Sequence, residues 1–272
     1  MKCFTVTVSI VLAAAAAGAC SSSSSTQGTA GDAGATTDSA GSSGGTEDGG
    51  SADSAGPTST IACGAAPFVN IGLVVRQVAS GGGTAPAVEG ATLTSSLCLG
   101  KSAITGPDGV ITAQVTKSAP FVPRFDAPNY ATTLIAELQF DADKTGIEAP
   151  LPPALFTALV PGFGPTKTAI IVGLSKGGGT GACDALDGVA FTVTGHPEAV
   201  VTYFTDDAIP QIAKGGVTTA AGRAAITELA VGAPVSIAGT KTGCTIDFAR
   251  APYTGKAPLE AGALTLVPAY VH

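Results

Sequence analysis

Four cysteines, Cys63, Cys98, Cys183 and Cys244, constrain the fold of this chain more than any other feature. An even number of cysteines in an exported chain predicts two disulfide bonds, with three possible connectivities. Prolines between residues 150 and 165 divide the four into two pairs. We therefore expect Cys63 to pair with Cys98, and Cys183 with Cys244, so that each bond lies within one domain. A zinc site is the alternative, but no two of the four have the Cys-x-x-Cys spacing of zinc ligands.

The first 19 residues predict export. Lys2 precedes an apolar run from Phe4 to Ala17, which has the length of a signal-peptide core and is too short to span a membrane. The run ends in Ala17-Gly18-Ala19-Cys20, which resembles a bacterial lipobox, although Ala17 stands where leucine is usual. The resemblance implies a signal peptide over residues 1–19, lipidation of Cys20 and a place at the outer membrane or cell surface. The same residues also fit ordinary signal-peptide cleavage, which would leave the protein periplasmic or secreted.

Residues 20–60 predict a disordered tether. They are almost only Ser, Gly, Ala, Thr and Asp, and their acids have no Lys or Arg among them. Such a segment cannot bury enough apolar surface to offset its chain entropy. As a Gly/Ser coil it would have a root-mean-square span of about 35 Å. The lipid anchor would therefore hold the folded part clear of the membrane surface.

The chain from Ile61 onward predicts an all-β fold. The sequence is 45% hydrophobic with 5% aromatic residues, no Trp, 37 Gly and 18 Pro. Short apolar runs between Gly and Pro favour strands over long helices. The net charge of -7 comes without a basic cluster, which argues against a nucleic-acid partner. Expected strands include Val69–Val78, Ala91–Leu97, Val110–Val115, Phe121–Phe125, Thr132–Phe140, Ala169–Val172 and Arg223–Leu229.

Three turn motifs of the first half carry a resemblance to a known family. They are Val88-Glu89-Gly90-Ala91-Thr92-Leu93, Thr105-Gly106-Pro107-Asp108-Gly109 and Ala127-Pro128-Asn129-Tyr130. Their order is similar to that of the carboxypeptidase regulatory-like, or transthyretin-like, domain, with Asn129 in place of a glycine. Asn tolerates the positive φ that such a corner needs. The resemblance implies an Ig-like antiparallel sandwich that carries no zinc.

The second half repeats the first two motifs as Leu186-Asp187-Gly188-Val189-Ala190-Phe191 and Thr218-Thr219-Ala220-Ala221-Gly222. We therefore expect tandem transthyretin-like (prealbumin-like) sandwiches at residues 61–147 and 168–272. A Pro-rich linker at residues 148–167 would join them. Within this linker, Leu155, Phe156 and Leu159 share the face of a short helix predicted over Pro153–Val160.

Gly173-Leu174-Ser175-Lys176-Gly177 matches the G-x-S-x-G pattern of serine hydrolases. Asp184 or Asp187 and His196 would be the partners of Ser175. A nucleophile elbow needs a helix directly after the serine, whereas glycines follow here. A flexible β-turn is therefore the favoured interpretation, and a serine hydrolase is the remote alternative.

Three further motifs suggest ligands. Leu99-Gly100-Lys101-Ser102 ends like a P-loop but has Ser95 where its first glycine should be, so we expect no phosphate cradle and no cofactor. Asp141, Asp143 and Glu148 are candidates for calcium, although Pro152 occupies the position of the usual bidentate glutamate. Tyr203, Asp206 and Asp207 are candidates for an aromatic, acidic rim that stacks on a sugar.

The sequence therefore predicts a non-enzymatic surface lipoprotein whose β-sandwiches bind a ligand or give structural support. Its partners would be the membrane, through the lipid anchor, and a protein or glycan. A carbohydrate- or calcium-dependent adhesion module is the alternative.

Overall fold

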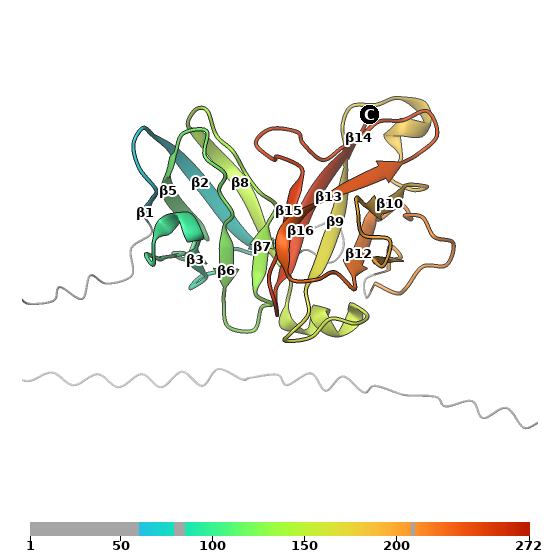
Figure 1. Cartoon of the computed structure of the whole chain (residues 1–272), viewed down its shortest axis with the longest axis horizontal. Helices are drawn as coiled ribbons and strands as arrows, with labels where there is room; N and C mark the ends of the chain where they lie inside the picture. The colour runs from blue at the N-terminus through green and yellow to red at the C-terminus, as the bar shows by residue number, and fades with distance from the viewer. Residues whose placement is uncertain (1–59, 79–84, 208–209) are drawn as a thin grey trace, which may run out of the picture. The chain divides into compact units, whose positions relative to one another are not determined.

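The computed structural model describes residues 60–78, 85–207 and 210–272 (Figure 1). The predicted signal peptide, Cys20 and the tether up to residue 59 lie outside the described residues. Within the described ranges the chain is almost entirely β-structure, which confirms the predicted fold class. In chain order the elements are β1 (Thr60–Cys63), β2 (Phe68–Gln77), β3 (Thr92–Thr94), the 3-10 helix η1 (Ser96–Cys98), β4 (Ala103–Ile104), β5 (Val110–Thr116), β6 (Arg124–Asp126), β7 (Thr133–Ile135), β8 (Lys144–Leu151), the 3-10 helix η2 (Ala154–Leu159), β9 (Ala169–Lys176), the 3-10 helix η3 (Gly181–Asp184), β10 (Ala190–Val193), β11 (Val200–Tyr203), β12 (Arg223–Thr227), β13 (Gly232–Thr240), β14 (Ile246–Asp247), β15 (Lys256–Leu259) and β16 (Leu264–Val271).

The first sandwich packs a sheet of order β1-β5-β2-β8 against the strands β4-β3-β6-β7. Strand β5 shows why the sequence folds this way, because buried Ile111, Ala113 and Val115 alternate with exposed Thr112 and Gln114. This period of two places one apolar row on the face that meets the opposite sheet. The resulting core contains the fully buried side chains Ile71, Leu73, Leu93, Ile111, Phe121, Phe125, Leu138 and Leu151.

The second sandwich has the same strand plan. The strands β11-β12-β9-β16 form one layer, and a three-stranded sheet of order β10-β13-β15 forms the other. Its core includes Ile170, Val172, Phe191, Ile226 and Val267. In each sandwich one strand pairs antiparallel with the central strand, β5 with β2 and β12 with β9. A later strand pairs parallel with the central strand, β8 with β2 and β16 with β9.

A buried threonine makes the same hydrogen bonds in both sandwiches. Thr105 Oγ1 accepts from the Ala91 N–H at 2.8 Å and donates to the Val88 carbonyl at 2.7 Å. Thr218 Oγ1 accepts from the Val189 N–H at 2.9 Å and donates to the Leu186 carbonyl at 2.7 Å. Gly90 and Gly188 follow the two acidic residues with φ of 75° and 76°. The motif repeat read from the sequence is therefore a repeat of structure.

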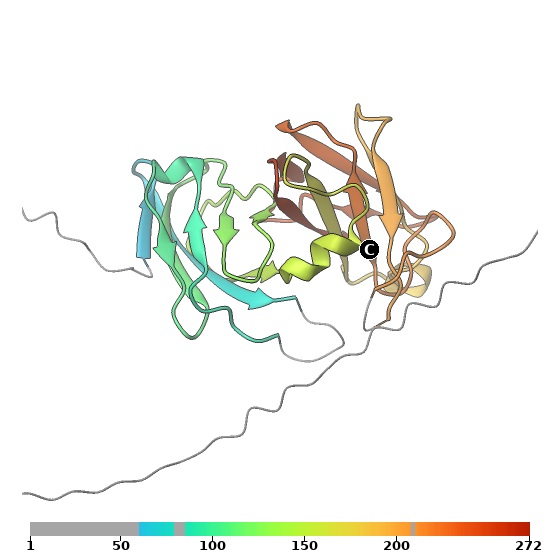
Figure 2. The ribbon, with the colours of Figure 1, turned by 90° about the horizontal axis from the view of Figure 1, so that it is seen from below.

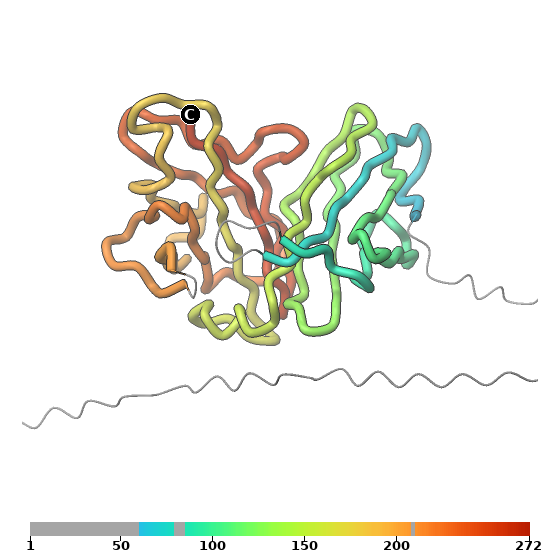
Figure 3. The backbone as a smooth tube through the Cα atoms, turned by 180° about the vertical axis from the view of Figure 1, so that it is seen from behind, coloured from blue at the N-terminus to red at the C-terminus, as the bar shows by residue number. Residues whose placement is uncertain are grey.

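The two sandwiches are joined by hydrogen bonds between strands. Strand β16 pairs parallel with β7 at Leu264↔Thr133, Thr265↔Leu134 and Leu266↔Ile135. This pairing merges one layer of each sandwich into a single sheet of nine strands. Eight of them follow the order β11-β12-β9-β16-β7-β6-β3-β4, and the ninth, β14, pairs with the end of β16. Figure 3 shows the red C-terminal strand beside the green strands of the first half.

The two halves of the nine-stranded sheet bury opposite faces against their own sandwich cores. Paired residues point to the same side of a sheet. In the first half the face of Leu93 and Phe125 packs into the first core. The opposite face, which carries Leu134 at β7, continues through Thr265 and Ile170 into the second core. The β1-β5-β2-β8 layer and the β10-β13-β15 layer therefore cover different sides of one sheet.

The segment predicted as a linker has two structural roles. Residues 148–151 belong to β8, so the predicted linker begins inside a strand of the first sandwich, which the sequence prediction did not anticipate. The predicted short helix is present as η2 (Figure 2), but Leu155 is 85% exposed and does not share a buried face. Instead Phe156 and Phe163 pack on Ala169, Ala225 and Leu264, the side of the second half that faces away from β10-β13-β15. The exact domain limits of 147 and 168 remain a prediction.

The expectation of antiparallel sheets is also incomplete. In the part of the chain that the structure describes, four strand pairs are parallel, namely β1–β5, β2–β8, β9–β16 and β7–β16. For β8 and β16 the physical reason is the path of the chain. Before each of these strands the chain runs through the opposite layer of the sandwich, in β7 or β15. It then returns to the layer of the central strand and runs beside that strand in the same direction.

Candidate binding groove

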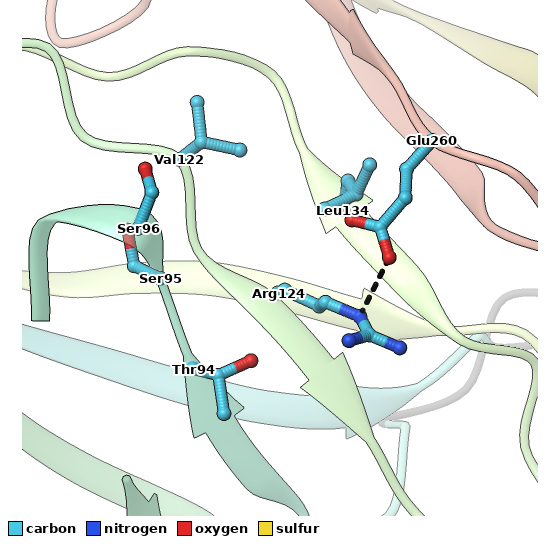
Figure 4. A pocket seen from close by; sticks show the side chains of 7 residues that line it. All are labelled: Thr94, Ser95, Ser96, Val122, Arg124, Leu134 and Glu260. Atoms are coloured by element: carbon cyan, nitrogen blue, oxygen red, sulfur yellow. Dashed lines mark ion pairs between the residues drawn. The ribbon is translucent and has the colours of Figure 1, made fainter. Parts of the chain in front are cut away.

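A row of three side chains crosses the uncovered face of the first half of the nine-stranded sheet. Thr94 of β3 pairs with Arg124 of β6, and Arg124 pairs with Leu134 of β7. Because paired residues share a face, the three side chains stand next to one another. Together with Ser95, Ser96, Val122 and Glu260 they line an open groove of about 260 Å³ (Figure 4).

Local structure at the strand ends supplies the polar rim. Ser95 caps η1, since its side chain accepts a hydrogen bond from the Leu97 N–H, and Ser96 is the first residue of that helix. Cys98, at the end of η1, is bonded to Cys63 of β1. The disulfide therefore holds the serine-bearing turn beside the groove. Glu260 comes from the turn between β15 and β16, so the second sandwich also contributes to the rim.

Arg124 is the electrostatic centre of the groove. Its Nη2 donates to Asp126 Oδ1 at 3.2 Å, and its Nε lies 3.3 Å from Glu260 Oε1. Thr132 Oγ1 also donates to Asp126, at 2.7 Å. The contact with Glu260 has the distance of an ion pair but not the alignment of a hydrogen bond, so Arg124 Nε is a buried N–H without a hydrogen-bond partner among the described residues. All three charged side chains are between one third and one half exposed, so these ion pairs add little stability.

The groove combines hydrogen-bond donors and acceptors on a rigid strand surface. The guanidinium of Arg124 donates, the carboxylate of Glu260 accepts, and the hydroxyls of Thr94 and Ser96 do both. Its lining contains neither a histidine nor a cysteine. This set of groups can recognise a polar ligand, but it offers no nucleophile paired with a base.

The residues of the remote serine-hydrolase alternative contact other partners in the structure. Ser175 lies within β9, where it pairs with Tyr270 of β16. Both the nucleophile elbow and the flexible β-turn placed this serine on a turn, so both interpretations of the motif were wrong about its local structure. A serine in an extended ladder is not aimed as in a nucleophile elbow. Asp184 forms an ion pair with Lys176 at 3.1 Å, and Asp187 lies 3.8 Å from Lys241. His196 Nδ1 lies 2.8 Å from Glu198.

The calcium candidates do not form a site in the described structure. Asp143 accepts hydrogen bonds from the backbone and side chain of Asn70, at 2.8 and 3.2 Å, which lower the pKa of its carboxyl. Asp141 accepts from Ser118 Oγ at 2.6 Å. Glu148 stands on β8, which is a strand and not the loop that the sequence suggested. Among the described residues no three His, Cys, Asp or Glu side chains gather as metal ligands.

The aromatic member of the predicted sugar rim is a core residue. Tyr203 is 5% exposed, and its hydroxyl accepts a hydrogen bond from the Phe191 N–H at 2.9 Å. Burial raises the pKa of this hydroxyl. Asp206 accepts from Thr219 and Asp207 from Thr205, at 2.9 and 2.7 Å. Tyr203 therefore closes the edge of β10 and cannot stack on a ligand.

Both predicted disulfides are present, as Cys63–Cys98 and Cys183–Cys244. The first is buried, whereas the second joins Cys183 of η3 to Cys244, just before β14, and both of these cysteines are only partly buried. The predicted lipid site at Cys20 lies outside the described residues. Across residues 60–78, 85–207 and 210–272, no helix has the length and apolar character needed to cross a membrane.

Sequence reasoning did not find the groove. Thr94, Arg124, Leu134 and Glu260 are far apart in the chain, and only the strand register brings them together. The one available signal was Arg124, a charge inside the otherwise apolar run Phe121–Phe125.

No protein-family model matches the chain. No curated protein sequence matches it either. Among solved structures, the Bacillus anthracis TIE protein is similar over 75% of this chain, at 11% identity and a TM-score of 0.26, and the chain spans about a third (34%) of that protein. The shaft pilin SpaA of Lactobacillus rhamnosus GG matches 75% of this chain and 98% of its own at 11% identity, with a TM-score of 0.23. A streptococcal ancillary pilin matches 75% of this chain and 62% of its own at 14% identity, with a TM-score of 0.23. The fold assignment therefore rests on the strand order described above.

Proposed function

We propose that this protein is an exported, non-catalytic surface protein in which residues 60–272 form a disulfide-bonded double sandwich for binding or structural support. The observation that carries the proposal is the β7–β16 pairing, because it joins two repeated sandwiches into one continuous sheet. A module of this kind presents a fixed surface. The two disulfides support export, since such bonds persist in oxidising compartments.

The proposal includes two finer statements. The carboxypeptidase regulatory-like type is supported by turn geometry, because Asn129 has a φ of 67° and the Gly106–Gly109 turn closes by a hydrogen bond of 2.9 Å. The lipid anchor is supported by the sequence around Cys20, and the tether that follows would carry the double sandwich away from the membrane.

Residual dipolar couplings of the Cys20→Ala protein test the rigid double sandwich. A single alignment tensor should fit the amides of both sandwiches, because the shared strand pairing leaves no freedom between them. Two independent tensors would contradict the proposal. Palmitate labelling tests the anchor separately: wild-type protein should incorporate the label and Cys20→Ala should not, and equal labelling of both would rule the anchor out.

A further inference from the structure

We infer that the carboxylate of Glu137 is a latch between the two sandwiches. It holds a short segment of the first sandwich against the second, and the segment opens locally when the charge is removed. The inference goes beyond the proposed function, because it concerns the double sandwich itself and does not depend on export or on the anchor.

Residues 136–139, which continue the chain beyond β7, close one side of the second sandwich. The Ala136 N–H donates to the Leu266 carbonyl of β16 at 2.9 Å, and the Glu137 N–H donates to the Lys256 carbonyl of β15 at 3.0 Å. Strand β16 belongs to the nine-stranded sheet, and β15 belongs to the layer that covers it. The segment therefore bridges the two layers of the second sandwich, where β7, β15 and β16 meet (Figure 1).

The contact is reciprocal, because the second sandwich also supplies residues to the first. Leu138 forms a β-bridge with Tyr253, and the Gln139 N–H donates to the Pro252 carbonyl at 2.8 Å. Tyr253 packs against the cores of both sandwiches, and Leu266 packs against the core of the first. Each sandwich therefore uses a short piece of the other to complete its packing.

Glu137 brings a buried charge to this contact. The residue is 8% exposed, and carboxylates are seldom buried unless they are paired. Thr254 holds it twice: its Oγ1 donates to Glu137 Oε1 at 2.9 Å, and its N–H donates to the Glu137 carbonyl at 3.0 Å. Lys256 Nζ lies 3.9 Å from the carboxylate. Because the carboxylate is largely shielded from water, these attractions are stronger than they would be at the surface.

The segment could leave the second sandwich without unfolding either core. Ala136 is its member in the second core, and the side chain of alanine is a single methyl group. Leu138 belongs to the first core and can stay there when the segment separates from β15. Regions with few buried apolar contacts open at a lower free energy than the whole fold. Hydrogen bonds and the charge of Glu137 therefore carry much of the attachment, and removing the charge should release it.

Native-state hydrogen exchange of the Cys20→Ala protein, read by NMR, tests the inference. Glu137→Gln keeps the size of the side chain and an acceptor for Thr254 but removes the charge. Four backbone amides bond across the contact and should exchange about 10–100-fold faster in this variant, the effect of one lost interaction with a charged group. They are the amides of residues 136, 137, 139 and 254.

Amides within a single sandwich give the internal comparison. The Val75 N–H donates to Gly109 in the first sandwich, and the Leu174 N–H donates to Gly222 in the second, both at 2.8 Å. Their exchange rates should stay unchanged in Glu137→Gln. A variant that merely destabilises the fold would accelerate them as well, because whole-fold unfolding exposes every amide.

Two further substitutions and a control complete the test. Thr254→Val removes the hydroxyl that donates to the carboxylate and should accelerate the same four amides, whereas Thr254→Ser keeps the hydroxyl and should not. Glu228→Gln is the matched control. Glu228 also faces a lysine, Lys167 at 3.5 Å, but it is half exposed and follows β12, two strands away from β16. This variant should leave the four amides unchanged.

Three results would overturn the inference. The first is unchanged exchange of the four amides in Glu137→Gln. The second is equal acceleration of the Val75 and Leu174 amides, and the third is equal acceleration of the four amides by Glu228→Gln. If Glu137→Gln does not fold, Thr254→Val decides by the same criteria.

Discussion

Replacing the buried threonines by valine tests whether the second sandwich is a true repeat of the first. Thr105 and Thr218 are each 3% exposed. In either position valine keeps the shape but removes the hydroxyl, so one backbone N–H and one carbonyl lose their partner. An unsatisfied buried group costs roughly 1–3 kcal/mol, and part of this is offset by the added methyl, so we expect a loss of about 2–4 kcal/mol for each variant.

Urea unfolding of the Cys20→Ala protein, followed by far-ultraviolet circular dichroism, measures this loss. With a slope of roughly 2 kcal/mol per molar urea, each variant should lower the midpoint by about 1–2 M. Thr105→Ser and Thr218→Ser keep the hydroxyl and should cost less than about 1 kcal/mol. The two sites share no partners, so the double valine variant should lose the sum of the single losses. If Thr218→Val were as stable as wild type while Thr105→Val was not, the structural repeat would be refuted.

Three other changes give separate tests. Tyr203→Phe leaves the N–H of the buried Phe191 without its acceptor and should lower the free energy of unfolding by about 1–3 kcal/mol in the same urea assay. An unchanged midpoint would mean that the hydroxyl is not needed at the edge of β10. Burial raises the pKa of Tyr253 from its usual 10.0 to about 12, so this residue stabilises the fold fully below pH 10 and loses that contribution as the pH rises toward 12. The free energy of unfolding should fall over this window in wild type and fall less in Tyr253→Phe, and equal slopes would contradict the assignment. Mild dithiothreitol treatment of the native protein should reduce the partly exposed Cys183–Cys244 bond before the buried Cys63–Cys98 bond. Alkylation of the freed thiols and mass mapping would show the order, and the reverse order would contradict the burial described above.

The sequence predicted those parts of the fold in which local signals agree. Strand β5 was evident from its alternating pattern, and the turn at Gly106–Gly109 from its Pro and Gly. The disulfide pairs followed from the spacing of the cysteines and the prolines between them. In each case a short stretch of sequence was enough, because the determining contacts are local or the number of choices was small.

The strands expected from the sequence did not include β16, which contains Pro268. Proline is normally excluded from central strands, since it cannot donate a ladder hydrogen bond. Pro268, however, lies in a gap of the pairing: β7 contacts β16 only from Leu264 to Leu266, and β14 pairs only with Tyr270 and Val271. At Pro268 the strand is thus locally an edge on one side. That gap depends on the lengths of two other strands, which no local pattern reveals.

The same long-range pairing explains why the groove could not be predicted. The register places Leu134 of β7 between Arg124 of β6 and the buried Thr265 of β16, and the sequence around Leu134 gives no sign of either partner. Arg124 comes from the first sandwich and Glu260 from the second, and their contact exists only while β7 and β16 are paired. The groove therefore depends on the junction between the two sandwiches. A substitution that breaks the β7–β16 pairing should therefore remove the Arg124–Glu260 contact even where each sandwich keeps its own core.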